Sequence, residues 1–167
     1  ALEKAKGLSA DTLIFDLEDA VAPEAKADAR AAILNAVQGG GYDPREIVVR
    51  INGLDTEWGE EDLKTAVKAG ADAILVPKVV SGADIDRLDA ALTAAGAPAG
   101  FGLWVMIEMP LAILNIQEIA EAAQRTRLVA FVMGTNDLAK EYRARATPDR
   151  IAFQTALGLS MAAARAY

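Results

Sequence analysis

The sequence alternates short apolar runs with longer segments that carry helix signals, and this order constrains the fold more than any other feature. The apolar runs are continuous and rich in β-branched residues, which is typical of strands buried on both faces. We expect strands at 11–17, 46–50, 73–77, 103–107 and 128–133. We expect helices at 23–38, 56–69, 81–95, 111–123 and 148–167, with the tail of another at 1–10. Strands that alternate with helices predict βα units and a parallel sheet.

Helix boundaries are predicted from capping residues. Thr56 is expected to be an N-cap, since several acidic residues follow it in the first turns, where the helix dipole favours them. Gly70 is expected to end the same helix. Ser81 or Gly82 is placed near the start of the next one.

Two architectures fit this order, a (β/α)8 barrel and an open doubly wound sheet, and the strand ends favour the barrel. Both place function at the carboxyl ends of the strands. An open sheet has its crevice at one switch point, whereas a barrel brings all its strand ends to one centre. Every expected strand here ends on polar or charged residues, namely Glu18 and Asp19, Arg50 and Asn52, Lys78, Glu108, and Asn136 and Asp137.

The interpretation is therefore a single, incomplete barrel domain over residues 1–167, covering about strands 2–6. A complete barrel has eight strands, so the first strand, the last two and any C-terminal lid would lie outside this sequence. The chain does not begin with methionine, which agrees with a start inside a longer protein.

Two residue types are absent from the composition, and their absence restricts the possible catalytic chemistry. The chain has no cysteine and no histidine, which excludes disulfides, thiolate zinc sites and Ser-His-Asp catalysis within these residues. Proton transfer then needs a carboxylate, a lysine, a tyrosine or a metal-bound water. A net charge of −7 argues against a nucleic-acid partner. No apolar run is long enough to span a membrane. The lack of cysteine and histidine favours a reducing, cytoplasmic setting.

Glu108 and Asp137 are the first candidates for metal ligands. Each follows an expected strand, and Mg²⁺ usually takes one or two carboxylates and leaves its other positions to substrate and water. The structural alternatives are an acid at a helix N-terminus for Glu108, since Pro110 follows it, and an N-cap for Asp137.

The segment Asp16–Asp19 supplies further carboxylates, and Arg50 supplies a cation. Period-2 alternation places Asp16 and Glu18 on one side and Asp19 on the other. These acids could orient metal-bound waters, accept a proton, or hold Arg50 and Lys78, and a turn with solvated acids is the structural alternative. Arg50 could bind a carboxylate in bidentate fashion or stabilise an oxyanion. An ion pair with the acids is compatible with either role.

Lys78 and the segment Gly134–Asp137 carry weaker signals. Lys78 is interpreted either as a structural ion pair or as a Schiff-base lysine. The backbone N–H groups of Gly134, Thr135 and Asn136 precede a helix and could bind an anion. The segment matches neither Gly-x-Gly-x-x-Gly nor a P-loop, so nucleotide binding has no support.

Five short motifs occur in this chain in the order in which one known family has them. They are LIFDLEDAV at 13–21, VVRIN at 48–52, LVPKV at 75–79, MIE at 106–108 and GTNDL at 134–138. On these motifs the chain resembles the citrate lyase β-subunit and malyl-CoA lyase group of the HpcH/HpaI aldolase superfamily, over nearly its whole length. It departs at Met109–Pro110, where many relatives have Thr-Ala or Thr-Pro. The first strand of the family, with its own arginine, lies outside this sequence.

The resemblance implies a (β/α)8 barrel that binds Mg²⁺ through Glu108 and Asp137. It implies that Arg50 contacts a 2-oxo acid and that Glu18 and Asp19 lie beside the site. Members cleave a 3-hydroxyacyl-CoA to acetyl-CoA and a 2-oxo acid of the oxaloacetate, pyruvate or glyoxylate type, or form that bond in reverse. They commonly assemble as trimers or hexamers, so a homotrimer or hexamer is expected.

The combined hypothesis is a Mg²⁺-dependent carbon–carbon lyase. Arg50 and the metal would stabilise the charge that develops as the bond breaks, with Glu18 beside them and Asp19 as the visible candidate for the base. Substrate binding is assigned to Arg50, Lys78, Gly134, Thr135 and Asn136. Two alternatives stay open: a metal-dependent aldolase acting on free 2-oxo acids, and a non-catalytic barrel subunit of a larger complex.

Overall fold

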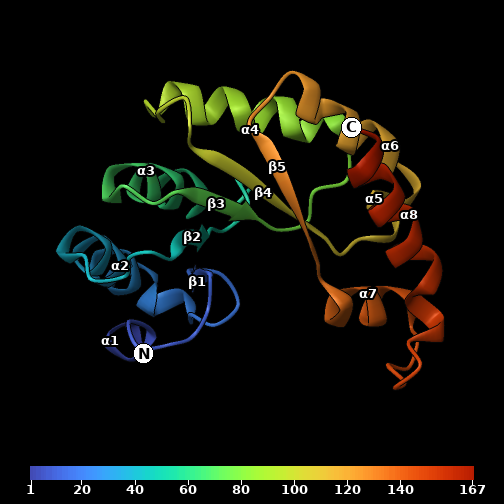
Figure 1. The fold of residues 1–167 in the computed structure, drawn as a ribbon, viewed down its shortest axis with the longest axis horizontal. Coiled ribbons are helices and arrows are strands. Elements are labelled where there is room, and N and C mark those ends of the chain that lie inside the picture. Colours follow the sequence, from blue (N-terminus) through green and yellow to red (C-terminus); the bar gives the residue numbers. More distant parts are fainter. The chain divides into compact units, whose positions relative to one another are not determined.

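The computed structural model describes residues 1–167 as two compact units, each with its own parallel strands. The first comprises Ala1–Val76 and Leu92–Gly102, and the second comprises Pro77–Ala91 and Leu103–Tyr167. Strands and helices alternate along the chain (Figure 1). The predicted α/β class is therefore confirmed.

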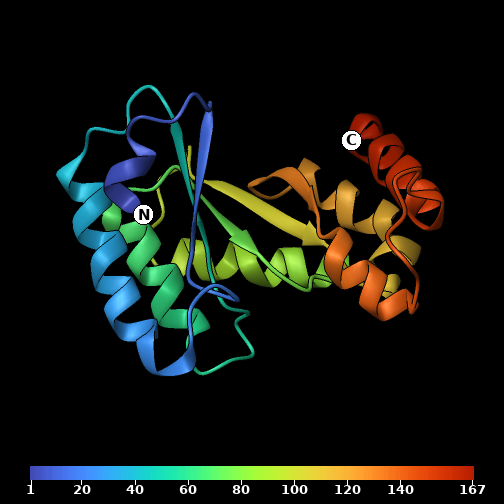
Figure 2. The same cartoon turned by 90° about the horizontal axis from the view of Figure 1, so that it is seen from below.

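The first unit has three parallel strands with helices beside them. Its strands are β1 (Thr12–Asp16), β2 (Glu46–Arg50) and β3 (Ala73–Val76). Its helices are α1 (Leu2–Ala5), the 3-10 turn η1 (Pro23–Ala25), α2 (Lys26–Gly39) and α3 (Gly59–Ala69). β1 pairs with β2 and β2 with β3, all in parallel. Figure 2 shows α2 and α3 side by side along these strands.

Burial differs among the strands of the first unit. The three central residues of β2 and all four residues of β3 are buried. In β1, Leu13 and Phe15 are buried while Ile14 between them is exposed. The expected burial on both faces is right for β2 and β3 and wrong for β1, because only one face of β1 packs against the core.

The second unit pairs β4 with β5 and contains several helices. Its strands are β4 (Gly102–Ile107) and β5 (Leu128–Met133), which are parallel with a register irregularity between Leu103 and Trp104. Its helices are α4 (Gly82–Ala94), α5 (Pro110–Leu114), α6 (Ile116–Glu121), η2 (Ala122–Gln124), α7 (Thr135–Tyr142), η3 (Ile151–Phe153) and α8 (Gln154–Ala166). The division between the units falls within α4 and β4. None of the helices is both long and apolar enough to span a membrane.

Two predicted helix boundaries are confirmed and one is wrong. Gly70 is the C-cap of α3, with a φ of 80°. Ser81 caps α4, because its hydroxyl accepts the Asp84 N–H at 3.2 Å and its own N–H donates to the Asp84 carboxylate at 3.0 Å. Thr56 does not cap α3, which begins at Gly59. The Thr56 hydroxyl instead donates to the Gly53 carbonyl at 2.7 Å and closes a turn ahead of the helix.

Two other predicted helices are interrupted or start later. The helix expected over 111–123 is broken at Asn115, whose side chain donates to the Val80 carbonyl at 2.9 Å. The helix expected from residue 148 begins only after Arg150, which has a φ of 53° and so cannot continue a right-handed helix. At the N-terminus, the expected helical tail over 1–10 is limited to α1.

Candidate functional site

The carboxyl ends of β1 and β2 carry an arginine surrounded by acids. Their register places Asp16 opposite Arg50. Arg50 Nε and Nη2 donate to the two oxygens of the Asp16 carboxylate at 2.7 and 2.5 Å, which makes a bidentate pair. Arg50 Nη1 lies 2.8 Å from Glu18 Oε2 and 3.9 Å from Asp19 Oδ2. These contacts fix the plane of the guanidinium before any ligand is present.

Asp16 and Arg50 are both ionised at neutral pH. Burial acts to raise the pKa of Asp16, but hydrogen bonds from Arg50 and from the N–H groups of Glu18 and Ala20, with the attraction of the guanidinium, hold it below its ordinary value of 3.8. The pKa of Arg50 is raised, first by its hydrogen bond to Asp16. A carboxylate with a lowered pKa is a poor proton acceptor near neutrality. Asp16 is therefore suited to holding Arg50 rather than to moving a proton.

Asp16 also shapes the turn that follows β1. Its Oδ1 accepts the Glu18 N–H at 2.9 Å and its Oδ2 accepts the Ala20 N–H at 3.2 Å. Glu18 is buried against Arg50, whereas the Asp19 side chain is 65% exposed. This is the division that period-2 alternation predicts. Of the two acids assigned to catalysis, Asp19 is the one in contact with solvent.

Two buried charges beside this turn are missed by reasoning from motifs. Lys26 is 5% exposed and Asp62 is fully buried. The sequence carried a signal for both, because Lys26 lies seven residues before the buried Ile33 and Asp62 lies four residues before the buried Ala66. Each charge thus falls on the inward face of an amphipathic helix.

In the second unit, Glu108 directly follows β4 and is 1% exposed. Its Oε1 accepts the backbone N–H of Lys78 at 2.8 Å. Lys78 has a φ of 57°, a left-handed conformation that costs free energy for any residue with a Cβ. Glu108 is not a first-turn helix acid, because Met109 is the N-cap of α5 and Glu108 precedes it.

Gly134 leaves room for the Glu108 side chain. The Gly134 N–H donates to the Ile107 carbonyl at 3.1 Å, which extends the pairing of β4 and β5 by one residue. A Cβ on Gly134 would lie 2.5 Å from Glu108 Cβ and 2.6 Å from Glu108 Oε2. Glycine is therefore required here while Glu108 keeps its position. Anion binding by Gly134 stays a prediction.

Asp137 is the third residue of α7 and not its cap. The helix begins at Thr135, and Gly134 is its N-cap. The N-cap alternative for Asp137 is therefore wrong. The residue is half-buried in the first turn, where the helix dipole favours a carboxylate. Thr135 is half-buried and Asn136 is exposed in the same turn.

The donors of the second unit suit a hard cation. Glu108 and Asp137 offer carboxylate oxygens from the end of β4 and from the first turn of α7. Mg²⁺ prefers oxygen ligands and completes its octahedron with water and substrate. No group of three or more acidic side chains could hold a metal ion by itself. Metal binding by Glu108 and Asp137 stays a prediction.

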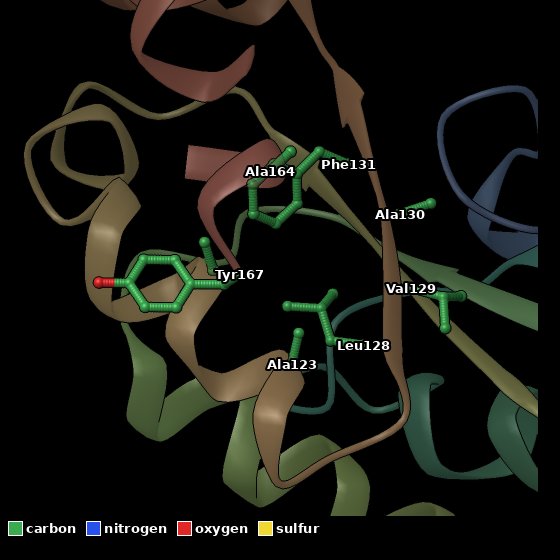
Figure 3. Close-up of a pocket in the computed structure, with 8 residues that line it drawn as sticks. Ala123, Leu128, Val129, Ala130, Phe131, Ala164 and Tyr167 are labelled. Atoms are coloured by element: carbon green, nitrogen blue, oxygen red, sulfur yellow. The ribbon is translucent and has the colours of Figure 1, made fainter. Parts of the chain in front are cut away.

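Two hollows in the surface are mainly apolar. In the second unit, a pocket of about 190 Å³ opens beside β5, with Leu128, Phe131 and Tyr167 among its lining residues (Figure 3). In the first unit, a hollow of about 420 Å³ is lined by residues of α1, β1 and α2, and Asp16 is its one charged member. Neither hollow contains the pair Glu108 and Asp137.

Parallel βα units with carboxylates and an arginine at the strand ends define an α/β protein. The model of one protein family, HpcH/HpaI aldolase/citrate lyase, matches residues 1–167. The chain belongs to this family. The resemblance drawn from the five motifs is thereby confirmed.

Similar proteins include both thioesterases and citrate lyase subunits. The chain is 48% identical over its full length to (3S)-malyl-CoA thioesterase from Cereibacter sphaeroides (strain ATCC 17029), of which it covers 55%. It is 37% identical over 145 residues to citrate lyase subunit beta from Escherichia coli (strain K12), with 84% of this chain and 47% of that protein covered. The chain therefore spans about half the length of the curated relatives it matches.

A solved structure of protein CitE from Mycobacterium tuberculosis, in complex with magnesium, acetoacetate and coenzyme A, has the same fold. Its TM-score is 0.72 at 26% sequence identity, with 94% of this chain and 54% of that chain covered.

Proposed function

We propose that the protein is a Mg²⁺-dependent carbon–carbon lyase that cleaves a 3-hydroxyacyl-CoA ester to acetyl-CoA and a 2-oxo acid, or forms that bond in reverse. The observation that carries the proposal is Glu108, a carboxylate at a strand end that is 1% exposed and oriented by a backbone N–H. Membership of the family and the CitE complex with magnesium and coenzyme A support the reaction class.

Glu108 and Asp137 are the residues that would hold the ion. Bound there, Mg²⁺ would supply Lewis-acid polarisation of an oxygen of the 2-oxo acid. Gly134 would support metal binding indirectly. Because it has no Cβ, the Glu108 carboxylate can keep its position.

Arg50 would bind the carboxylate of the 2-oxo acid and stabilise the charge that develops on oxygen. Asp16 and Glu18 already hold the guanidinium at 2.7 and 2.8 Å, so little orientational freedom is lost when the ligand binds. The raised pKa of Arg50 keeps the cation present throughout the physiological pH range.

Asp19 would accept the proton of the 3-hydroxyl group. As that proton leaves, the carbon–carbon bond breaks and its electron pair passes to the thioester carbon fragment, which is then protonated to give acetyl-CoA. The exposed side chain of Asp19 can return its proton to solvent. Lys78, Thr135 and Asn136 are proposed to contact the substrate.

The proposal extends to the whole fold and its assembly. We infer a (β/α)8 barrel in which the five strands are five of the eight. Within each unit, consecutive strands pair in parallel and in chain order, which supports a barrel, whereas a doubly wound sheet reverses its order at a switch point. A homotrimer or hexamer is part of the same proposal.

Arg50→Ala and Asp137→Ala test the assignment. Each should lower acetyl-CoA release from malyl-CoA or citramalyl-CoA in the presence of Mg²⁺ by at least about 100-fold, because each removes a charge that stabilises the transition state. Arg87→Ala is the control, since Arg87 lies in an exposed ion pair with Asp84. Normal turnover by both test variants would show that the assignment is wrong.

Thioester hydrolysis is the second candidate, favoured by the 48% identity to (3S)-malyl-CoA thioesterase. The two reactions differ in the bond that breaks. Cleavage of the carbon–carbon bond of malyl-CoA gives acetyl-CoA and glyoxylate, whereas hydrolysis gives malate and free coenzyme A. Chromatography of the products, together with a thiol assay, decides between them. A release of thiol without acetyl-CoA would replace the lyase by a hydrolase.

A further inference from the structure

Lys26 is a buried lysine whose amine supports the turn after β1. It is the first residue of α2 and is 5% exposed. Its Nζ donates to the carbonyl oxygens of Leu17 at 2.8 Å and Glu18 at 3.0 Å. It also lies 4.9 Å from the centroid of the Trp58 ring. The ammonium group is thus held by two carbonyls and a ring face rather than by a carboxylate.

A buried ammonium group loses its hydration and needs other partners. The two carbonyl dipoles and the face of the Trp58 ring supply them. An apolar side chain of similar length would fill the same space without the desolvation cost. The charge of Lys26 is therefore better explained by the carbonyl groups that it orients than by packing.

The Leu17 carbonyl is held from a second side as well. Asn52 Nδ2 donates to it at 2.9 Å. Asp62 Oδ2 in turn accepts the backbone N–H of Asn52 at 3.0 Å and its Nδ2 at 2.6 Å, while Arg30 Nη1 binds Asp62 Oδ1 at 2.9 Å. The two peptide units that flank the Cα of Glu18 are therefore fixed by hydrogen bonds from α2 and from the residues after β2.

We propose that Lys26 is a positioning residue for the pair of Glu18 and Arg50. Two fixed peptide planes determine φ and ψ of Glu18 and hence the direction of its Cα–Cβ bond, from which its rotamers start. That direction places Glu18 Oε2 at 2.8 Å from Arg50 Nη1. Lys26 acts through the backbone and does not touch the substrate. The inference rests on the proposed function, in which Arg50 binds the 2-oxo acid.

Lys26→Met is the main test, with Lys6→Met as a matched control. Lys6 also lies over an aromatic ring, 5.3 Å from the centroid of Tyr42, but its side chain is partly exposed and paired with Glu3. Lys26→Met should lower kcat for thioester cleavage at least about tenfold per folded molecule, with KM changed less than about threefold, because misplaced groups slow the chemical step. Lys6→Met should leave both constants unchanged.

Amide hydrogen exchange of the intact protein gives a readout that does not depend on activity. The N–H groups of Glu18 and Ala20 donate to the Asp16 carboxylate, and the Val21 N–H donates to the Glu18 carbonyl. In Lys26→Met these three amides should exchange at least about tenfold faster, while the amides of β2 keep their rates.

The outcomes separate positioning from simple stabilisation. A Lys26→Met protein with a lower melting temperature but an unchanged kcat and unchanged exchange after β1 overturns the proposal. If Lys26→Met does not fold, Trp58→Leu weakens the same environment and should show the same changes at smaller amplitude, and unchanged exchange there overturns it equally. If the wild-type protein releases no acetyl-CoA from any thioester, the proposed function fails, and the exchange rates still decide whether Lys26 holds the turn.

Discussion

The two strand ends that carry the candidate residues are built in different ways. After β1 and β2, the acids are held by another side chain, since Arg50 bonds to both Asp16 and Glu18. After β4, Glu108 is oriented by the main chain, through the N–H of Lys78 and the space left by Gly134. The first arrangement places an arginine among three acids, and the second places a carboxylate against a peptide N–H and a glycine.

The difference indicates which substitutions should disturb each strand end. Truncating one partner of a buried ion pair leaves the other charge unpaired, which is strongly destabilising. Glu108 is instead sensitive to any Cβ at Gly134, because that atom would take the space of its carboxylate. Substitutions at Arg50, Gly134 and Lys78 therefore test the comparison directly.

Arg50→Met should have the largest effect on stability. It leaves Asp16 and Glu18 partly or fully buried without their guanidinium partner, and we expect a loss of about 3 kcal/mol in the free energy of unfolding at pH 7. Urea denaturation measures this. Arg87→Met is the control, because the Arg87 side chain is 67% exposed in its pair with Asp84, and its loss should be below about 0.5 kcal/mol. Similar losses of unfolding free energy in the two variants would show that the ion pairs of Arg50 do not stabilise the ends of β1 and β2.

Gly134→Ala should have an intermediate effect. The added Cβ would lie 2.6 Å from Glu108 Oε2, so the carboxylate or the backbone must move. We expect about 2 kcal/mol of destabilisation and weaker Mg²⁺ binding in a calorimetric titration. Gly158→Ala in α8 is the matched control, since nothing lies within 4 Å of its Cβ position, and it should stabilise by about 0.5 kcal/mol. A Gly134→Ala protein with wild-type stability and Mg²⁺ affinity would show that Glu108 is not confined.

The smallest expected effect is the difference in stability between Lys78→Gly and Lys78→Ala. Both remove the side chain and keep the N–H that donates to Glu108 Oε1. They differ only in the Cβ, which is unfavourable at a φ of 57°. The glycine variant should therefore be more stable than the alanine variant by about 1 kcal/mol, as read from thermal unfolding. An alanine variant of equal stability would mean that the backbone of Lys78 is not strained.

The strands were predictable because their signal is local. The expected strand at 46–50 coincides with β2, and the one at 128–133 coincides with β5. Helix interruptions were not predictable, because they depend on contacts with residues far along the chain. Asn115, for example, leaves the helix to donate to the Val80 carbonyl, 35 residues away in the sequence.

The candidate site also has residues that the sequence predicted and contacts that it did not. The motifs indicated Glu18, Arg50, Glu108 and Asp137 as chemically important, and their roles stay proposals. The ion pair between Arg50 and the acids of 16–19 was an open alternative and is confirmed, but the motifs did not indicate that Asp16 makes it bidentate. Nor did they indicate that Gly134 makes room for Glu108 or that Lys26 supports the turn after β1. Each of these depends on a side-chain direction or a close approach that no spacing in the sequence encodes.

The sequence by itself determined the α/β class, the parallel strands and the family, because periodicity and short motifs are properties of neighbouring residues. Only the tertiary structure decided which partner each charge has. It set Arg50 against Asp16, 34 residues away, and buried Lys26 under the carbonyls of Leu17 and Glu18. The physical reason is that the free energy of a charge depends on burial and on the geometry of its neighbours, which exist only once the chain has folded.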